Sequence, residues 1–156
     1  MKYRRLTREE LQELEKEFVE FLAVNGIDGP MWQKIKEEEP EKTERFIELF
    51  SDVIFEGTMR KVKFLEMRSK HHLVCFQCLD SELVAVGMKD PLQREEVDFT
   101  NPDFISLSST SPPSGLEVYT TTRKYENQRE TELFDLTQKG AVITDNKLFN
   151  SLCLAL

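Results

Sequence analysis

The sequence predicts an α+β protein, with N-terminal helices, an antiparallel sheet of about four strands and two C-terminal helices in one globular domain over residues 1–156. Two patterns lead to this fold class. Apolar residues recur at helical spacing near both ends of the chain, and runs rich in β-branched and aromatic residues lie between them. The length is that of one domain, and 39% hydrophobic with 32% charged residues is typical of globular proteins.

The first helix has the clearest start signal. Thr7 precedes an apolar-periodic run and Glu10 follows three positions later, which is the pattern of a capping box. We expect this helix to end at Asn25-Gly26, since glycine can adopt the left-handed conformation that closes a helix.

Two more helices are expected in the N-terminal part. Gly29-Pro30 opens the first, because proline suits the first turn of a helix. Pro40 opens the other, and Gly57 is expected to close it. The inward-facing residues predicted for the shorter helix are Met31, Trp32 and Ile35.

The sheet is predicted to centre on Arg60–Lys89, which reads RKVKFLEMRS, KHHLVCFQCLD and SELVAVGMK. These three β-rich runs with short polar turns between them predict an antiparallel meander. Apolar residues face both ways in the second run, as in a central strand covered on both sides. Leu116–Tyr125 alternates and is the expected fourth strand, and residues 106–115, rich in Ser and Pro, are the expected flexible loop.

Two helices are expected at the C-terminal end. Asn127 with Glu130 resembles another capping box, and Gly140 is placed to end the helix that it opens. Ala141–Ile143 is expected to be a short extended link, and Thr144 to cap the last helix.

Charge and cysteine content bound the function. The net charge of −8 and pI of about 4.9 oppose general binding to nucleic acid or anionic membranes. Met1–Arg5 and Arg60–Lys70 are locally basic, and we interpret both as solvated faces. The N-terminus lacks the apolar run of a signal peptide, and no stretch is apolar enough for a transmembrane helix. Three cysteines cannot all pair within one chain, which favours a reducing, cytoplasmic location.

Four residues are the candidates for any catalytic chemistry: His71, His72, Cys75 and Cys78. The two cysteines have C-x-x-C spacing, but they lie inside a β-run, where residues three apart point to opposite faces. Neither a metal nor a disulfide would then bridge them, so we predict buried packing cysteines, no metal site and no cofactor. A Cys/His nucleophile pair formed across the sheet remains the alternative.

No phosphate-binding, zinc-protease or nucleophile-elbow motif occurs in the chain. Aromatic and arginine side chains are the usual anchors of protein interfaces. The candidates for such a binding surface are Trp32, Tyr119, Arg123 and Tyr125, although Trp32 fits a core position equally well.

Three segments, MKYRRLTREELQELEKEF, IELFSDVIFEG and ELFDLTQKGAVIT, resemble a family of small uncharacterised bacterial proteins. The resemblance covers nearly the whole chain and implies that it is a complete protein. It assigns no activity, ligand or catalytic residue.

The sequence therefore favours a non-catalytic cytoplasmic module that binds another protein or itself. A small enzyme with a Cys/His pocket is the alternative. A nucleic-acid accessory protein using Arg60–Lys70 is the third and least favoured hypothesis.

Overall fold

The computed structural model describes residues 1–104 and 113–156, and the α+β class is confirmed. The chain forms two compact units, Met1–Arg60 and Lys61–Leu156, which are described separately below. The single domain therefore stays a prediction. The loop expected at 106–115 falls, as far as residue 112, outside the described residues.

The N-terminal unit is helical, and its first helix begins with the predicted capping box. The amide of Glu10 donates to Thr7 Oγ1 at 3.2 Å, and the Glu10 carboxylate accepts from the Thr7 amide at 2.8 Å. The expected single helix is interrupted at Leu14, whose backbone leaves the helical region (φ −102°, ψ 21°). The four helices are α1 (Arg8–Glu13), α2 (Glu15–Val24), α3 (Gly29–Glu38) and α4 (Pro40–Lys61).

Two expectations for these helices were wrong. Met31 is 47% exposed, whereas Ile35 on the same helix is buried. Gly57 does not close α4, which continues to Lys61. A glycine inside a helix costs only about 1 kcal/mol relative to alanine, and Met59, 3% exposed, extends the buried stripe beyond it.

The N-terminal segment is attached to α4 by hydrogen bonds. The Leu6 amide donates to the buried Ser51 hydroxyl at 2.9 Å, and the amides of Lys2 and Tyr3 donate to the Asp52 carboxylate. These contacts place Leu6, 2% exposed, in the interior of the unit.

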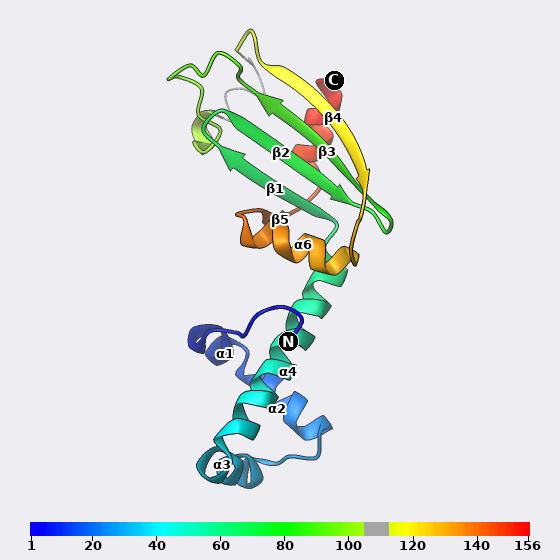
Figure 1. Ribbon diagram of the computed structural model, residues 1–156. Helices are drawn as coiled ribbons and strands as arrows, with labels where there is room; N and C mark the ends of the chain where they lie inside the picture. Colours follow the sequence, from blue (N-terminus) through cyan, green and yellow to red (C-terminus); the bar gives the residue numbers. More distant parts are fainter. Residues whose placement is uncertain (105–112) are drawn as a thin grey trace. The chain divides into compact units, whose positions relative to one another are not determined.

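The second unit contains a five-stranded antiparallel sheet in the order β4-β3-β2-β1-β5 (Figure 1). The predicted meander is confirmed, and β2 is its central strand. One strand was missed: Val142–Thr144 overlaps the segment Ala141–Ile143 that was expected to be an extended link, and it pairs with the start of β1. The strands are β1 (Phe64–Ser69), β2 (His72–Cys78), β3 (Glu82–Lys89), β4 (Glu117–Lys124) and β5 (Val142–Thr144).

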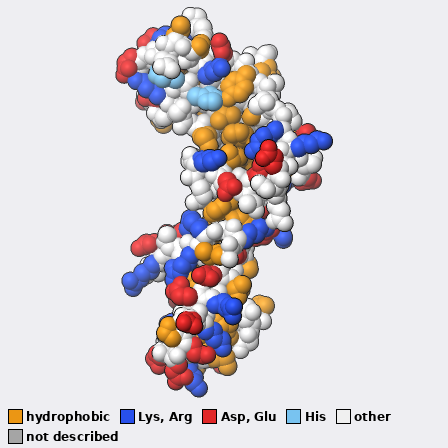
Figure 2. Space-filling model, in the orientation of Figure 1, with side chains coloured by type: hydrophobic (Ala, Val, Ile, Leu, Met, Phe, Trp, Pro, Cys, Tyr) orange, Lys and Arg blue, Asp and Glu red, His pale blue; other side chains and the backbone are white. Residues whose placement is uncertain are grey.

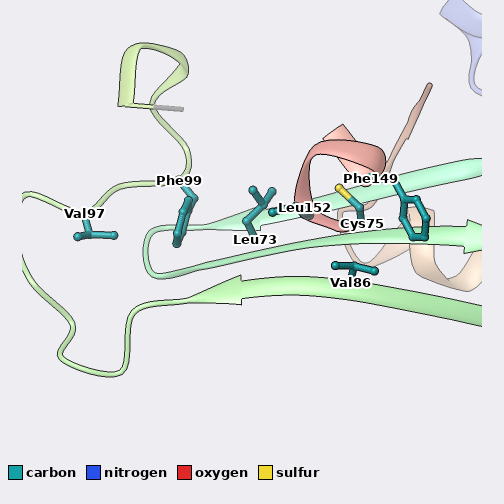
Figure 3. Packing of buried hydrophobic residues seen from close by; sticks show 7 residues of the cluster. All are labelled: Leu73, Cys75, Val86, Val97, Phe99, Phe149 and Leu152. Carbon is teal, nitrogen blue, oxygen red and sulfur yellow. The ribbon is translucent and has the colours of Figure 1, made fainter. Parts of the chain in front are cut away.

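Helix α7 (Lys147–Leu154) packs on one face of β2 and β3, as Figure 3 shows. The core there also takes two side chains from the segment after β3, which sequence patterns had not assigned to the core. The seven buried residues are Leu73, Cys75, Val86, Val97, Phe99, Phe149 and Leu152.

The buried carboxylate of Asp90 organises this segment. It accepts hydrogen bonds from the backbone and guanidinium of Arg94 and from the Leu92 amide. The turn so formed precedes Val97 and Phe99, which are 0% and 1% exposed.

Both C-terminal helices begin without the predicted caps. Helix α6 (Arg129–Gln138) has Gln128 as its N-cap, with no side-chain cap hydrogen bond. Thr144 cannot cap α7, because it belongs to β5 and pairs with Phe64. Gly140, with φ of 114°, follows α6 as expected.

Helix α6 is held to the end of β2 by one arginine. The Arg129 guanidinium donates to the carbonyls of Leu79 and Cys78, each at 3.0 Å, and also to that of Val62. Leu133 of α6 is fully buried. This helix therefore covers only one end of the sheet (Figure 1).

Candidate functional site

The candidate site lies on the sheet face opposite α7, which we call the open face because α7 does not cover it. The centre of this face is shielded from solvent, since Val74 and Ala85 are 8% and 7% exposed. Side chains alternate along a strand, so the face that lacks Leu73 and Cys75 carries His72, Val74 and Phe76 from β2. The strand register places two cross-strand rows on it. Figure 2 shows hydrophobic side chains gathered on this part of the molecule beside a histidine. The rows are His72–Lys89–Glu117 and Val74–Gly87–Tyr119.

Tyr119 lies across the open face instead of pointing away from it. A β-carbon placed on Gly87 would lie 2.3 Å from Tyr119 Cζ, so the ring fills the space above that glycine. The Tyr119 hydroxyl thereby reaches His72 Nε2 at 2.5 Å, two strands away. The ring is therefore fixed by its packing over Gly87 and by the hydrogen bond of its hydroxyl to His72, and the residue remains half-buried.

The charges around this ring are balanced. Lys89 Nζ lies 5.7 Å from the Tyr119 ring centroid and 3.6 Å from the Glu117 carboxylate. Burial and the nearby Lys89 charge lower the pKa of His72, and burial raises the pKa of Tyr119. At neutral pH a neutral imidazole therefore faces a protonated phenol, and neither group is a charged reactant.

Two other predicted binding residues lie at the far end of β4. Arg123 forms an ion pair with Glu132 at 2.8 Å and stays exposed. The Tyr125 hydroxyl donates to the Leu79 carbonyl at 3.0 Å, and burial raises its pKa to about 12. Tyr125 thus contributes to packing of the β2–β3 hairpin, while Arg123 is half-exposed and paired with a carboxylate that is 11% exposed.

Trp32 lies in the other unit, within the helical core. Its ring meets Phe18 and Phe46 edge-on, with centroids 5.2 and 6.3 Å apart. It packs with the buried cluster of Leu22, Ile27 and Ile35. Trp32 is itself only half-buried, and these contacts favour the core role over the role of a binding anchor.

The two cysteines of the C-x-x-C pair face opposite sides of the sheet. Cys75 belongs to the core under α7, whereas Cys78 lies on the side of the open face, at the end covered by α6. Burial raises the pKa of Cys75 to about 12 and that of Cys78 to about 11. Both are free thiols, and both are unfavourable as thiolate nucleophiles.

The histidines do not approach either cysteine. His72 shares a face with Cys78, but six residues of strand separate them by roughly 20 Å. His71 lies in the turn before β2, where its Nδ1 is buried and has no hydrogen-bond partner among residues 1–104 and 113–156. The arrangement gives no support to a Cys/His nucleophile pair.

Several basic residues of the Arg60–Lys70 segment are paired with acids. Arg60 lies 3.3 Å from Glu56, Arg68 3.0 Å from Glu66, and Lys70 2.8 Å from Glu95. These pairs offset the local positive charge that would attract phosphate groups.

Within the described part of the chain, no group of three or more His, Cys, Asp or Glu residues is arranged to hold a metal ion. An open surface depression does lie where α3 ends and α4 begins, lined by Glu38, Glu39, Phe46 and Leu49 among others. It belongs to the helical unit and contains no residue of the open face. Over the same described residues, no helix combines the length and apolar character needed to cross a bilayer.

Strand β4 forms one edge of the sheet, and its outward backbone groups can be identified from the hydrogen bonds. The Tyr125 amide donates to the Ser81 carbonyl, so odd-numbered residues bond inward to β3. The even-numbered residues then turn their N–H and C=O groups outward: Val118, Thr120, Thr122 and Lys124. Among the described residues, no strand pairs with this edge.

Tyr119, Arg123 and His72 were among the candidates that the sequence suggested, whereas Gly87 and Lys89 were not. A glycine inside the β-run SELVAVGMK was the available signal, because such a glycine often marks the close approach of another group. The cross-strand row His72–Lys89–Glu117 depends on the strand register, which cannot be recognised from the order of residues along the chain.

The chain belongs to a family of unknown function (DUF6495), whose model matches residues 1–156. No curated protein and no solved structure matches the chain.

Proposed function

We propose, for a chain whose family has no assigned function, that this protein is a non-catalytic module that binds another polypeptide along β4. The observation that carries the proposal is a strand edge with which no strand pairs among residues 1–104 and 113–156, together with a fixed tyrosine beside it. An added strand gains main-chain hydrogen bonds from such an edge and side-chain specificity from the neighbouring face.

Tyr119 has the properties of an interface anchor. Its ring is half-buried over Gly87 and its hydroxyl is bonded to His72, so its conformation is set before a ligand arrives. Little side-chain entropy is then lost on binding. Tyrosine is also enriched among the residues that dominate binding energy.

The protonation state of the buried thiols supports a non-catalytic role. The raised pKa values of Cys75 and Cys78 leave almost no thiolate at neutral pH. The three free cysteines also support the proposed location in the reducing cytoplasm.

Affinity capture from the native cell, followed by mass spectrometry, tests the proposal. The parent is compared with Tyr119→Ala, which removes the anchor, and Thr122→Pro, which removes an outward N–H. We expect both variants to lose a polypeptide that the parent retains, after circular dichroism has shown that they fold. A partner set unchanged in both folded variants would contradict the proposal.

The control variant is His71→Ala with Cys78→Ala, which alters two of the four catalytic candidates and leaves the β4 edge intact. We expect it to keep the partner once its folding has been checked. A parallel hydrolase and transferase screen addresses the enzyme alternative. Turnover by the parent that this folded variant lacks would replace the binding hypothesis.

A further inference from the structure

The charge order of β4 selects among possible partner strands. Glu117 lies at its start and Arg123 and Lys124 at its end, with a neutral centre between them. If two copies of β4 meet antiparallel, the acidic start of each faces the basic end of the other. Parallel pairing would instead bring like charges together, which is unfavourable across strands.

We propose that two copies of this chain associate through antiparallel pairing of their β4 strands, which joins their sheets into one continuous sheet. This inference rests on the proposed function and names the polypeptide that occupies the same edge. Isologous two-fold pairing is also the commonest symmetry of homo-oligomers.

Backbone geometry restricts the register of the pairing. A two-fold axis perpendicular to the sheet keeps each face of the sheet on its own side, so even-numbered residues must pair with even-numbered residues and odd with odd. The even-numbered residues, whose backbone N–H and C=O groups turn outward, must form the hydrogen bonds between the two copies. An axis at Thr120 meets both conditions, since Thr120 faces its own copy and Val118 faces Thr122 of the second copy.

The same register pairs the end charges. Glu117 then lies opposite Arg123 of the second copy, and this contact occurs twice because of the symmetry. Within one chain these groups contact Lys89 at 3.6 Å and Glu132 at 2.8 Å. The side chains of Glu117 and Lys89 are 57% and 50% exposed, and an exposed ion pair contributes little to stability, so Glu117 is free to turn towards a second copy. Arg123 is 50% exposed but its partner Glu132 is only 11% exposed, so Arg123 turns towards a second copy only by giving up a partly buried ion pair.

The centre of β4 lacks the usual guards against edge pairing. Natural edge strands are often protected by proline, a bulge or a charge placed along the edge. Here the central residues are Thr120, Thr121 and Thr122, all exposed, and threonine is a good strand former. The charged residues of β4 lie only near its two ends, where antiparallel pairing places the acidic start of one copy opposite the basic end of the other.

The test is sedimentation equilibrium of the full chain over a micromolar to millimolar series. An edge of eight residues is a small interface, so we expect a dimer that dissociates on dilution. Thr122→Pro should give a monomer, because it removes an outward N–H without removing a bond to β3. Thr122→Val keeps that N–H and should remain dimeric.

Charge variants test the register. Glu117→Lys alone and Arg123→Glu alone each place like charges opposite each other twice, and each should raise the dissociation constant by roughly fivefold or more. Mixed together, the two variants should form a heterodimer, since both contacts become attractive again. Glu126→Lys, which changes an exposed charge just beyond β4, should behave like the parent.

Three results would overturn the inference. They are a parent that is monomeric throughout the series, a dimer that a folded Thr122→Pro chain retains, and charge variants that do not associate on mixing. A monomeric parent that still captures a different polypeptide through β4 would leave the proposed function standing. The two proposals therefore fail separately.

Discussion

The ring of Tyr119 on β4 occupies the space in which Gly87 on β3 would otherwise carry a side chain. Strand register brings the two residues opposite each other, and the missing β-carbon lets the ring lie flat enough to reach His72. An aromatic ring over a strand glycine also compensates for the packing that glycine lacks.

Gly87→Ala should displace the Tyr119 ring and break its hydrogen bond to His72. We expect a loss of about 1–2 kcal/mol in the free energy of unfolding, from overpacking and the lost hydrogen bond. Urea denaturation checks this value. In a Tyr119→Ala background the same substitution should cost much less, because the clash is gone, and equal costs in both backgrounds would refute the coupling.

Thr7→Ala should destabilise the protein by about 1 kcal/mol through loss of the N-cap. The motivation is the reciprocal box between Thr7 and Glu10. The urea midpoint measures the effect, and Thr58→Ala is the matched control. Thr58 bonds back to the Ile54 carbonyl inside α4, so its loss should be nearly neutral. Equal midpoints for Thr7→Ala and the parent would argue against the box.

His72 should titrate below its ordinary pKa of 6.5, because it is half-buried and lies near Lys89. The unfolded chain then binds the proton more tightly than the folded chain. The stability due to neutral His72 is complete above 6.5 and is lost as the pH falls below that value. NMR titration of the ring protons measures the pKa, and Lys89→Gln should raise it. A pKa at or above the ordinary value in the parent would contradict the expected burial.

Iodoacetamide should modify Cys153 before Cys75 and Cys78 in the folded protein. Cys153 is only half-buried, whereas the thiols of Cys75 and Cys78 have pKa values raised by burial to about 12 and 11. Mass spectrometry of the alkylated chain identifies the site, and all three should react in urea. Rapid native modification of Cys78 would show an accessible thiol and revive the enzyme alternative.

Patterns in the sequence were enough to predict those elements that are determined by residues close together in the chain. The Thr7–Glu10 box depends on residues three apart, and the meander depends on alternation and turns within one continuous stretch. The opposite orientation of Cys75 and Cys78 follows from strand geometry alone. The α+β class, the central position of β2 and the glycine end of α6 were predicted for the same reason.

Tertiary structure decided the features that join distant segments. Val142–Thr144 is a strand only because β1 offers it an edge, which also removes Thr144 from the cap of α7. Val97 and Phe99 become core residues because Asp90 and Arg94 turn their segment back on the sheet. The contact of Tyr119 with Gly87 and His72 depends on the register of three strands, and a linear pattern does not contain register. Short-range spacing thus determined the elements, whereas long-range pairing brought together the residues of the candidate site.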